Sequence, residues 1–228
     1  MRLKLIATAA ASAAILIGMT AAPAQANHSW GGYHWATTNG NVVKNITSSL
    51  TSNWAGNLTV ANSDWNASTH LQNTVVAGAT DLTTRTNCAM ISGAIRVCNA
   101  SYGATGWSGL ASINISGLHI TQGTTKLNDT YESGATAAER QGVTCQEVGH
   151  NFGLDHQDTT FGNPNLGTCM DYTYDWSTNQ HPNTHDYDEL SAIYNHNDGF
   201  TTSPPAGSSA GVTRIATGDS ITMVTWAK

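Results

Sequence analysis

Apolar and polar positions follow two different periods along this chain, and the change of period divides it into predicted elements. Between residues 27 and 130, short β-type runs interrupt a background rich in Asn, Thr, Ser and Gly. The runs cover residues 33–37, 74–77, 94–98 and 110–121. Because β-branched and apolar residues between turn-forming residues are typical of strands, this part of the chain predicts a sheet.

Helical spacing marks one segment within the sheet region. Trp54, Leu58, Ala61 and Trp65 recur at i, i+4, i+7 and i+11, with Ser52 available as a cap. This spacing places four apolar side chains on one face and predicts a helix that backs the sheet.

Two further helices are predicted in the second half of the chain. One begins near Thr136 and runs to about residue 152, where Gly153 ends it. Another covers residues 186–195, with apolar side chains on one face: Tyr187, Leu190, Ile193 and Tyr194. Strands followed by helices indicate the α+β class.

Both ends of the chain have a composition that sets them apart. Residues 1–26 carry Arg2 and Lys4, an apolar run and an Ala-Gln-Ala cleavage site, which are the parts of a secretory signal. Residues 201–228 are expected to be a linker, 201–211, and a hairpin of strands 212–216 and 221–226. We therefore expect a secreted, extracellular protein whose domain spans residues 27–200.

The charge of the chain excludes some classes of partner. Without the predicted signal, seven basic residues remain against 15 acidic ones, a net charge of −8. This sign argues against nucleic acid or an anionic membrane as partner, and we expect a monomer.

The four cysteines are expected to form two disulfides, because an exported chain folds in an oxidising compartment. Three pairings are possible. We favour Cys88 with Cys98, which closes a short loop, and Cys145 with Cys169, whose neighbours carry the chemistry below.

Residues 146–156 carry the strongest functional signal, with the sequence Gln-Glu-Val-Gly-His-Asn-Phe-Gly-Leu-Asp-His. On a helix, Gln146 and His150 face the same way and Glu147 lies beside them. Gly153 can take the positive φ that turns the chain, so that His156 returns toward His150. For nine His, four Glu and 22 Gly, chance gives this spacing at a frequency of roughly 6 in 10,000, so the pattern specifically indicates an open metal site.

The pattern resembles the metzincin clan of zinc peptidases, whose motif is His-Glu-x-x-His-x-x-Gly-x-x-His followed by a methionine turn. Thr168-Cys169-Met170-Asp171-Tyr172 is similar to that turn, with Met170 standing 14 residues after His156. Tyr172 matches the position where astacin-like and serralysin-like members carry a tyrosine near the metal. The resemblance covers about residues 110–197.

The resemblance implies a fold and an activity. The fold would be a twisted mixed sheet with backing and active-site helices in residues 27–156, and a small lobe in 157–200 with the methionine turn and a helix. The activity would be that of a zinc endopeptidase that acts on a protein or peptide substrate, with Glu147 as general base and Met170 and Gly153 as structural support. Segments 110–121 and 125–129 would be the strand bordering the cleft and its neighbour, and an extended substrate could pair along that edge.

Gln146 departs from the family motif, which has histidine there. Three interpretations stay open. In the first, which we favour, Gln146 ligates Zn²⁺ through its amide oxygen together with His150 and His156. In the second, His119, His185 or Asp155 completes the ligand set. In the third, the metal site is degraded and the scaffold serves as a non-catalytic binding protein. A second cation site among His181, His185, Asp186, Asp188 and Glu189 is conceivable, but the acidity typical of a helix N-terminus explains that group more simply.

Overall fold

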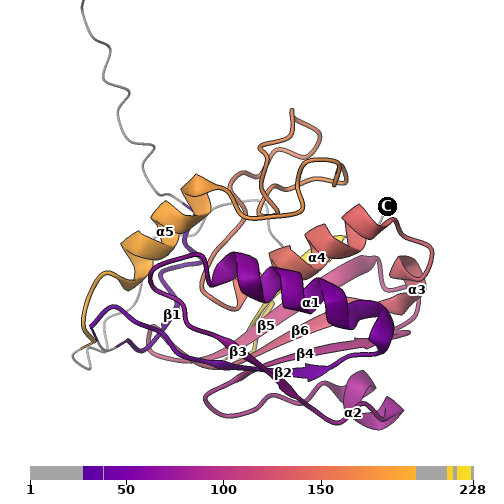
Figure 1. Ribbon diagram of the computed structural model, residues 1–228, viewed down its shortest axis with the longest axis horizontal. Helices are drawn as coiled ribbons and strands as arrows, with labels where there is room; N and C mark the ends of the chain where they lie inside the picture. Colours follow the sequence, from indigo (N-terminus) through magenta and orange to yellow (C-terminus); the bar gives the residue numbers. More distant parts are fainter. Residues whose placement is uncertain (1–27, 38, 199–214, 218–219, 227–228) are drawn as a thin grey trace, which may run out of the picture.

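The computed structural model describes residues 28–37, 39–198, 215–217 and 220–226, and the predicted signal and the whole of the predicted linker lie outside them. Its centre is a mixed sheet with strand order β3-β2-β4-β6-β5-β8-β7, while β1 pairs with the start of β6 (Figure 1). The strands are β1 His34–Trp35, β2 Asn45–Ser49, β3 Thr74–Ala77, β4 Ile95–Ala100, β5 Trp107–Ser116, β6 His119–Asn128, β7 Ile215–Thr217 and β8 Ser220–Trp226. The helices are α1 Ser52–Trp65, α2 Leu82–Asn87, α3 Asp129–Glu132, α4 Ala137–His150 and α5 Thr184–Tyr194. The predicted α+β class is confirmed.

Strand direction divides the sheet into two parts. Strands β1, β2, β3, β4 and β6 run parallel to one another, whereas β5 is antiparallel to β6 and to β8. The prediction of one strand over residues 110–121 is wrong, because Gly117, with φ of 63°, divides that run into the β5–β6 hairpin. Both arms of the hairpin carry β-type residues, so the pattern alone did not reveal the turn.

Helices α1 and α4 lie side by side on one face of the sheet (Figure 1). The predicted apolar face of α1 is confirmed, since Trp54, Leu58, Ala61 and Trp65 are all buried. The indole nitrogen of Trp65 donates to the Cys145 carbonyl of α4 at 3.0 Å. Ser52 is not the cap; Thr51, with extended backbone angles, precedes the helix.

The ends of α4 and α5 follow from their capping residues. Thr136 accepts a hydrogen bond from Glu139 N, which begins α4 where the sequence predicted it. The helix ends at His150, two residues earlier than expected. For α5, Asn183 and Asp186 form a capping box, so the helix begins slightly before the predicted range.

The C-terminal hairpin joins the main sheet. Strand β8 pairs antiparallel with β5, and β7 pairs with β8, so the hairpin adds two strands beyond β5. The predicted strand positions 212–214 and the Gly218-Asp219 turn lie outside the described residues. Within the described part of the chain, no helix has the length and apolar character needed to cross a bilayer.

Candidate metal centre

Helix α4 presents its functional side chains to the interior. Gln146 and His150 are four residues apart and Glu147 lies between them, and all three are at most 1% exposed. Trp65 and Met170 pack closely against this helix, because a Cβ built on Gly149 would lie 2.5 Å from the Trp65 ring and 2.7 Å from Met170 Sδ. Because Gly149 has no side chain, Trp65 and Met170 can pack against the helical turn that carries His150.

Gly153 makes the bend that the sequence predicted. Its φ is 84°, and a Cβ there would lie only 2.0 Å from the Tyr33 carbonyl oxygen. Both the backbone angle and the contact therefore require glycine. After the bend, His156 lies beside His150 with ring centroids 4.8 Å apart and ring planes at 86°.

The imidazole nitrogens of this pair fit a metal ion. His150 Nδ1 lies 2.8 Å from the Leu154 carbonyl oxygen, which can only accept, so Nδ1 carries the proton and Nε2 bears a lone pair. His150 Nε2 and both ring nitrogens of His156 are buried and have no hydrogen-bond partner among the described residues. Leaving such nitrogens unsatisfied costs about 1–3 kcal/mol each, and coordination of a zinc ion would satisfy them.

Burial also keeps both rings neutral. It lowers the pKa of His150, and it lowers the pKa of His156 well below the usual value, with His150 and His28 as further causes. A metal binds the neutral imidazole, so both residues are ready to act as ligands at neutral pH.

Gln146 connects α4 to the methionine turn. Its Nε2 donates to the Cys169 carbonyl at 2.8 Å and to the Asp171 carbonyl at 2.9 Å. Both neighbouring groups are carbonyl oxygens, which only accept hydrogen bonds, so the amide atom that faces them is the NH₂ nitrogen. Oε1 is therefore the atom through which Gln146 could ligate a metal.

The methionine turn lies beneath this helix. Met170 is fully buried, and its carbonyl accepts from Gln157 N at 2.7 Å. Tyr172 places its ring 5.2 Å from that of His156, and burial raises its pKa, so it keeps its phenolic proton. The disulfide Cys145–Cys169 joins helix and turn, and Cys88–Cys98 is the other, so both favoured pairings are confirmed.

Glu147 faces the antiparallel strand of the sheet. A Cβ on Gly109 of β5 would lie 2.6 Å from Glu147 Cγ and 2.7 Å from its Oε1. The Glu147 carbonyl accepts from Thr125 of β6 and from Asn151. The carboxylate is thus held in a narrow space between α4 and the glycine of β5.

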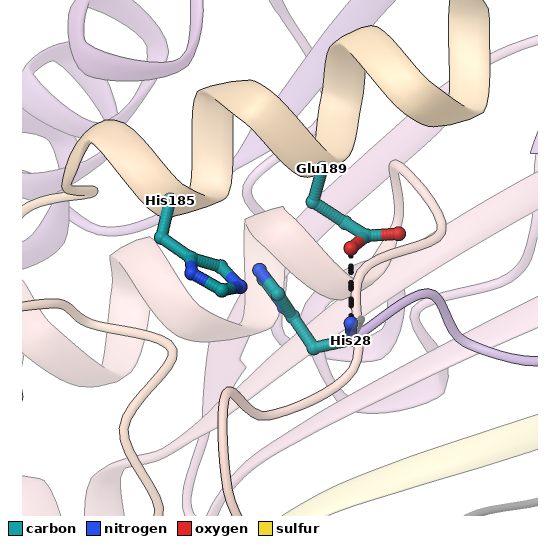
Figure 2. A group of neighbouring side chains, drawn as sticks. All are labelled: His28, His185 and Glu189. Carbon is teal, nitrogen blue, oxygen red and sulfur yellow. Dashed lines mark hydrogen bonds between the residues drawn. The ribbon is translucent and has the colours of Figure 1, made fainter. Parts of the chain in front are cut away.

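The histidines considered as substitute ligands belong to other groups. His185 lies with His28 and Glu189, and the Glu189 carboxylate accepts a hydrogen bond from the backbone N of His28 at 2.9 Å (Figure 2). His119 lies with His34 and Asp198. Among the described residues, neither group of His, Cys, Asp or Glu side chains gathered within 4.8 Å includes His150 or His156.

Sequence reasoning missed His28, His34 and Asp198. Asp155 was considered, and its Oδ1 lies 3.9 Å from His156 Nδ1 while its carbonyl lies 2.9 Å from His28 Nδ1. The missed residues stand far apart in the chain, and no spacing rule joins them. Their residue types, histidine and aspartate, were the one signal in the sequence that could have identified them.

Comparisons with known proteins give likenesses of fold only. No protein-family model and no curated protein sequence matches the chain. The solved structure of myroilysin is similar at 13% identity with a TM-score of 0.44, over 75% of this chain and 100% of that one. High choriolytic enzyme 1, a hatching enzyme zinc-protease from Oryzias latipes (medaka fish), is similar at 14% identity with a TM-score of 0.40, over 75% and 99%. The chemistry of this site depends on its own side chains.

Proposed function

We propose that this chain is a secreted zinc-dependent endopeptidase, with His150, His156 and the amide oxygen of Gln146 as metal ligands. The observation that carries the proposal is the pair of buried, neutral imidazoles, with ring centroids 4.8 Å apart, whose ring nitrogens lack hydrogen-bond partners at His150 Nε2 and at both positions of His156 among the described residues. Zinc, when bound, would supply a Lewis acid that activates water and polarises a peptide carbonyl. Secretion is supported by the signal sequence in residues 1–26 and by the two disulfides.

The chain's own residues would divide the work of peptide hydrolysis. Glu147 accepts the proton of the attacking water and returns it to the leaving amine. Tyr172, which keeps its phenolic proton, can donate a hydrogen bond to the oxyanion that develops on the substrate carbonyl. Met170 and the Cys145–Cys169 bridge hold the floor of the site in place.

Substrate access depends on β8. The sequence analysis expected an extended peptide to pair along the strand that borders the cleft, which is β5. In the structure Thr225 and Val224 of β8 pair there with Gly109 and Leu110, and β8 also contacts α4. We propose that a peptide pairs with β5 only when β8 has left it.

A non-catalytic binding protein is the second candidate. One observation favours it: the Gln146 amide is committed to two carbonyls of the methionine turn, where a peptidase of the resembled clan has an imidazole. Such a protein would bind a protein partner without cutting it. The two candidates share a fold and differ in chemistry.

One experiment separates these functions. The chain from residue 27 onward is purified, its zinc is counted, and cleavage of casein is measured with and without a chelator. We expect bound zinc, chelator-sensitive cleavage, and a loss of roughly 10²–10⁴-fold in Glu147→Gln with zinc retained. Zinc without cleavage would support the binding protein instead, and cleavage unchanged in Glu147→Gln would contradict the role of Glu147 as general base.

A further inference from the structure

Three imidazoles outside this site converge on a single carboxylate oxygen. The Nε2 atoms of His34, His119 and His196 lie 3.3, 3.0 and 2.9 Å from Asp198 Oδ1. These four residues, the Asp198 cluster, come from β1, from the start of β6 and from the segment that follows α5. No known motif in the sequence joins them.

The sheet fixes the first two members of the cluster. Strands β1 and β6 run parallel with His34 directly opposite His119, and their rings stand 5.0 Å apart at 76°. The His196 ring stands 4.9 Å from that of His34 at 83°. The rings thus meet edge to face, and their Nε2 atoms all point at Asp198.

The position of the proton on the neutral His34 ring places two hydrogen-bond acceptors opposite each other. His34 Nδ1 lies 2.8 Å from the Gly32 carbonyl oxygen, so in the neutral ring Nδ1 carries the proton. Nε2 then directs a lone pair at Asp198 Oδ1, which is also an acceptor, at 3.3 Å. Two acceptors at this distance repel each other unless a proton or a metal cation lies between them.

The donor atoms lie close enough together to share one metal ion. Zinc holds nitrogen and oxygen ligands at about 2.0–2.2 Å in a tetrahedron, which puts neighbouring ligand atoms about 3.3–3.6 Å apart. The distance of 3.3 Å from His34 Nε2 to Asp198 Oδ1 equals that spacing, whereas the distances of 3.0 and 2.9 Å from His119 and His196 are hydrogen-bond lengths that would increase slightly when a metal binds. The ligand atoms of His34, His119 and Asp198 all lie within 4.8 Å of one another.

We propose that the Asp198 cluster binds a zinc ion through the three imidazoles and the carboxylate. Groups behind the ligands already orient them, as metal sites require. The Gly32 carbonyl holds the His34 ring, and Thr37 N donates to Asp198 Oδ2 at 2.6 Å. His34, His119 and Asp198 would supply three ligands, and His196, whose Nε2 lies 2.9 Å from Asp198 Oδ1, would complete the tetrahedron after a small shift of its exposed side chain. Four protein ligands would leave no position for water, so the role we propose is structural.

The ion would fasten two parts of the fold together. His34 and His119 belong to the sheet, whereas His196 and Asp198 follow α5 of the C-terminal lobe. His34 is buried, His119 and Asp198 are partly exposed and His196 is exposed, so the ion can enter from solvent. Binding there would stabilise the contact of the lobe with β1 and β6.

Zinc counting on single variants tests the proposal. The full mature chain is loaded with zinc, passed over a desalting column and analysed for metal content, and its melting temperature is followed during zinc titration. We expect two zinc ions per chain in the wild type, one in His119→Ala and Asp198→Asn, and two in His181→Ala, whose side chain is 56% exposed. Folding of each variant is checked by circular dichroism.

The same count distinguishes failure here from failure of the α4 site. His150→Ala should also retain one zinc, and it should keep the zinc-dependent rise in melting temperature that His119→Ala and Asp198→Asn lose. One zinc in the wild type that only His150→Ala removes would overturn the Asp198 cluster alone. One zinc that only His119→Ala and Asp198→Asn remove would overturn the α4 site alone, and no zinc at all would overturn both.

Discussion

The two histidine groups of this protein differ in how the chain encodes them. His150 and His156 stand on one helix end and the bend that follows, within six residues. The Asp198 cluster joins residues that are 164 positions apart, at His34 and Asp198. The first group has a signature in the sequence because helix geometry and one glycine fix it, whereas the second exists only after β1, β6 and the α5 segment have met.

Gly153 is the residue at which the two groups are linked, and changing it should have the largest effect. Alanine there would require a positive φ and would approach the Tyr33 carbonyl, next to His34. We expect Gly153→Ala to lower the free energy of unfolding by about 4 kcal/mol in urea titrations, with weaker zinc binding at both groups. Gly117→Ala is the matched control, since it has φ of 63° but open space around it, and about 1 kcal/mol is expected. Equal effects of the two would show that the contact with Tyr33 is unimportant.

Gln146 belongs to the α4 site alone, so a change of this residue distinguishes the α4 site from the Asp198 cluster. Replacing it by glutamate keeps its size and removes both N–H donors, which leaves oxygen facing the Cys169 and Asp171 carbonyls. In the presence of a chelator, we expect Gln146→Glu to lose about 3 kcal/mol of unfolding free energy relative to the wild type. Without the chelator, the Asp198 cluster of this variant should keep its zinc. Gln180→Glu, at a partly exposed position, serves as control, and similar stability of both variants would contradict the bonding described.

Acid should weaken the metal-free protein through the α4 site. The pKa of His150 and of His156 is lowered in the folded state by burial, whereas it is about 6.5 in the unfolded chain. Above pH 6.5 neither state takes up a proton, and below it the unfolded state does so first, so stability falls as pH falls. The expected slope is up to about 1.4 kcal/mol per pH unit for each histidine. Urea titrations between pH 7 and 5 should show a smaller slope in His156→Asn, and an identical slope would contradict this.

Removing residues 201–228 deletes β7 and β8. The α4 site and the Asp198 cluster should stay intact, and the edge of β5 should become unpaired. We expect cleavage of an extended peptide to rise several-fold, because β8 no longer pairs with Gly109 and Leu110. Val224→Pro keeps the chain length but removes one backbone donor of β8, and should give a smaller rise. Unchanged cleavage by an otherwise active truncated protein would show that β8 does not restrict access.

The sequence predicted the elements whose signals are local. The apolar spacing from Trp54 to Trp65 and the Thr136 cap were sufficient for α1 and α4. Strand β2, with the sequence Asn-Ile-Thr-Ser-Ser, was missed because Ile46 is its one apolar residue. Its place in the sheet comes from pairing with β3 and β4, which a polar pattern does not reveal.

The candidate site divides in the same way. Glu147, His150, Gly153 and His156 could be found because they share one helix and its bend. That the Gln146 amide donates to the methionine turn could not, since its partners lie 23 and 25 residues further on. The position of β8 on β5 likewise depends on which edge of a folded sheet is open.

Two tryptophans give the α4 site an optical readout. The Trp30 ring meets the His150 ring edge to face at 6.0 Å, and Trp65 lies against Gly149 of the same turn. An imidazole near an indole changes its emission when it gains a proton or a metal ion. Intrinsic fluorescence can therefore follow metal loading at His150 in real time without a label.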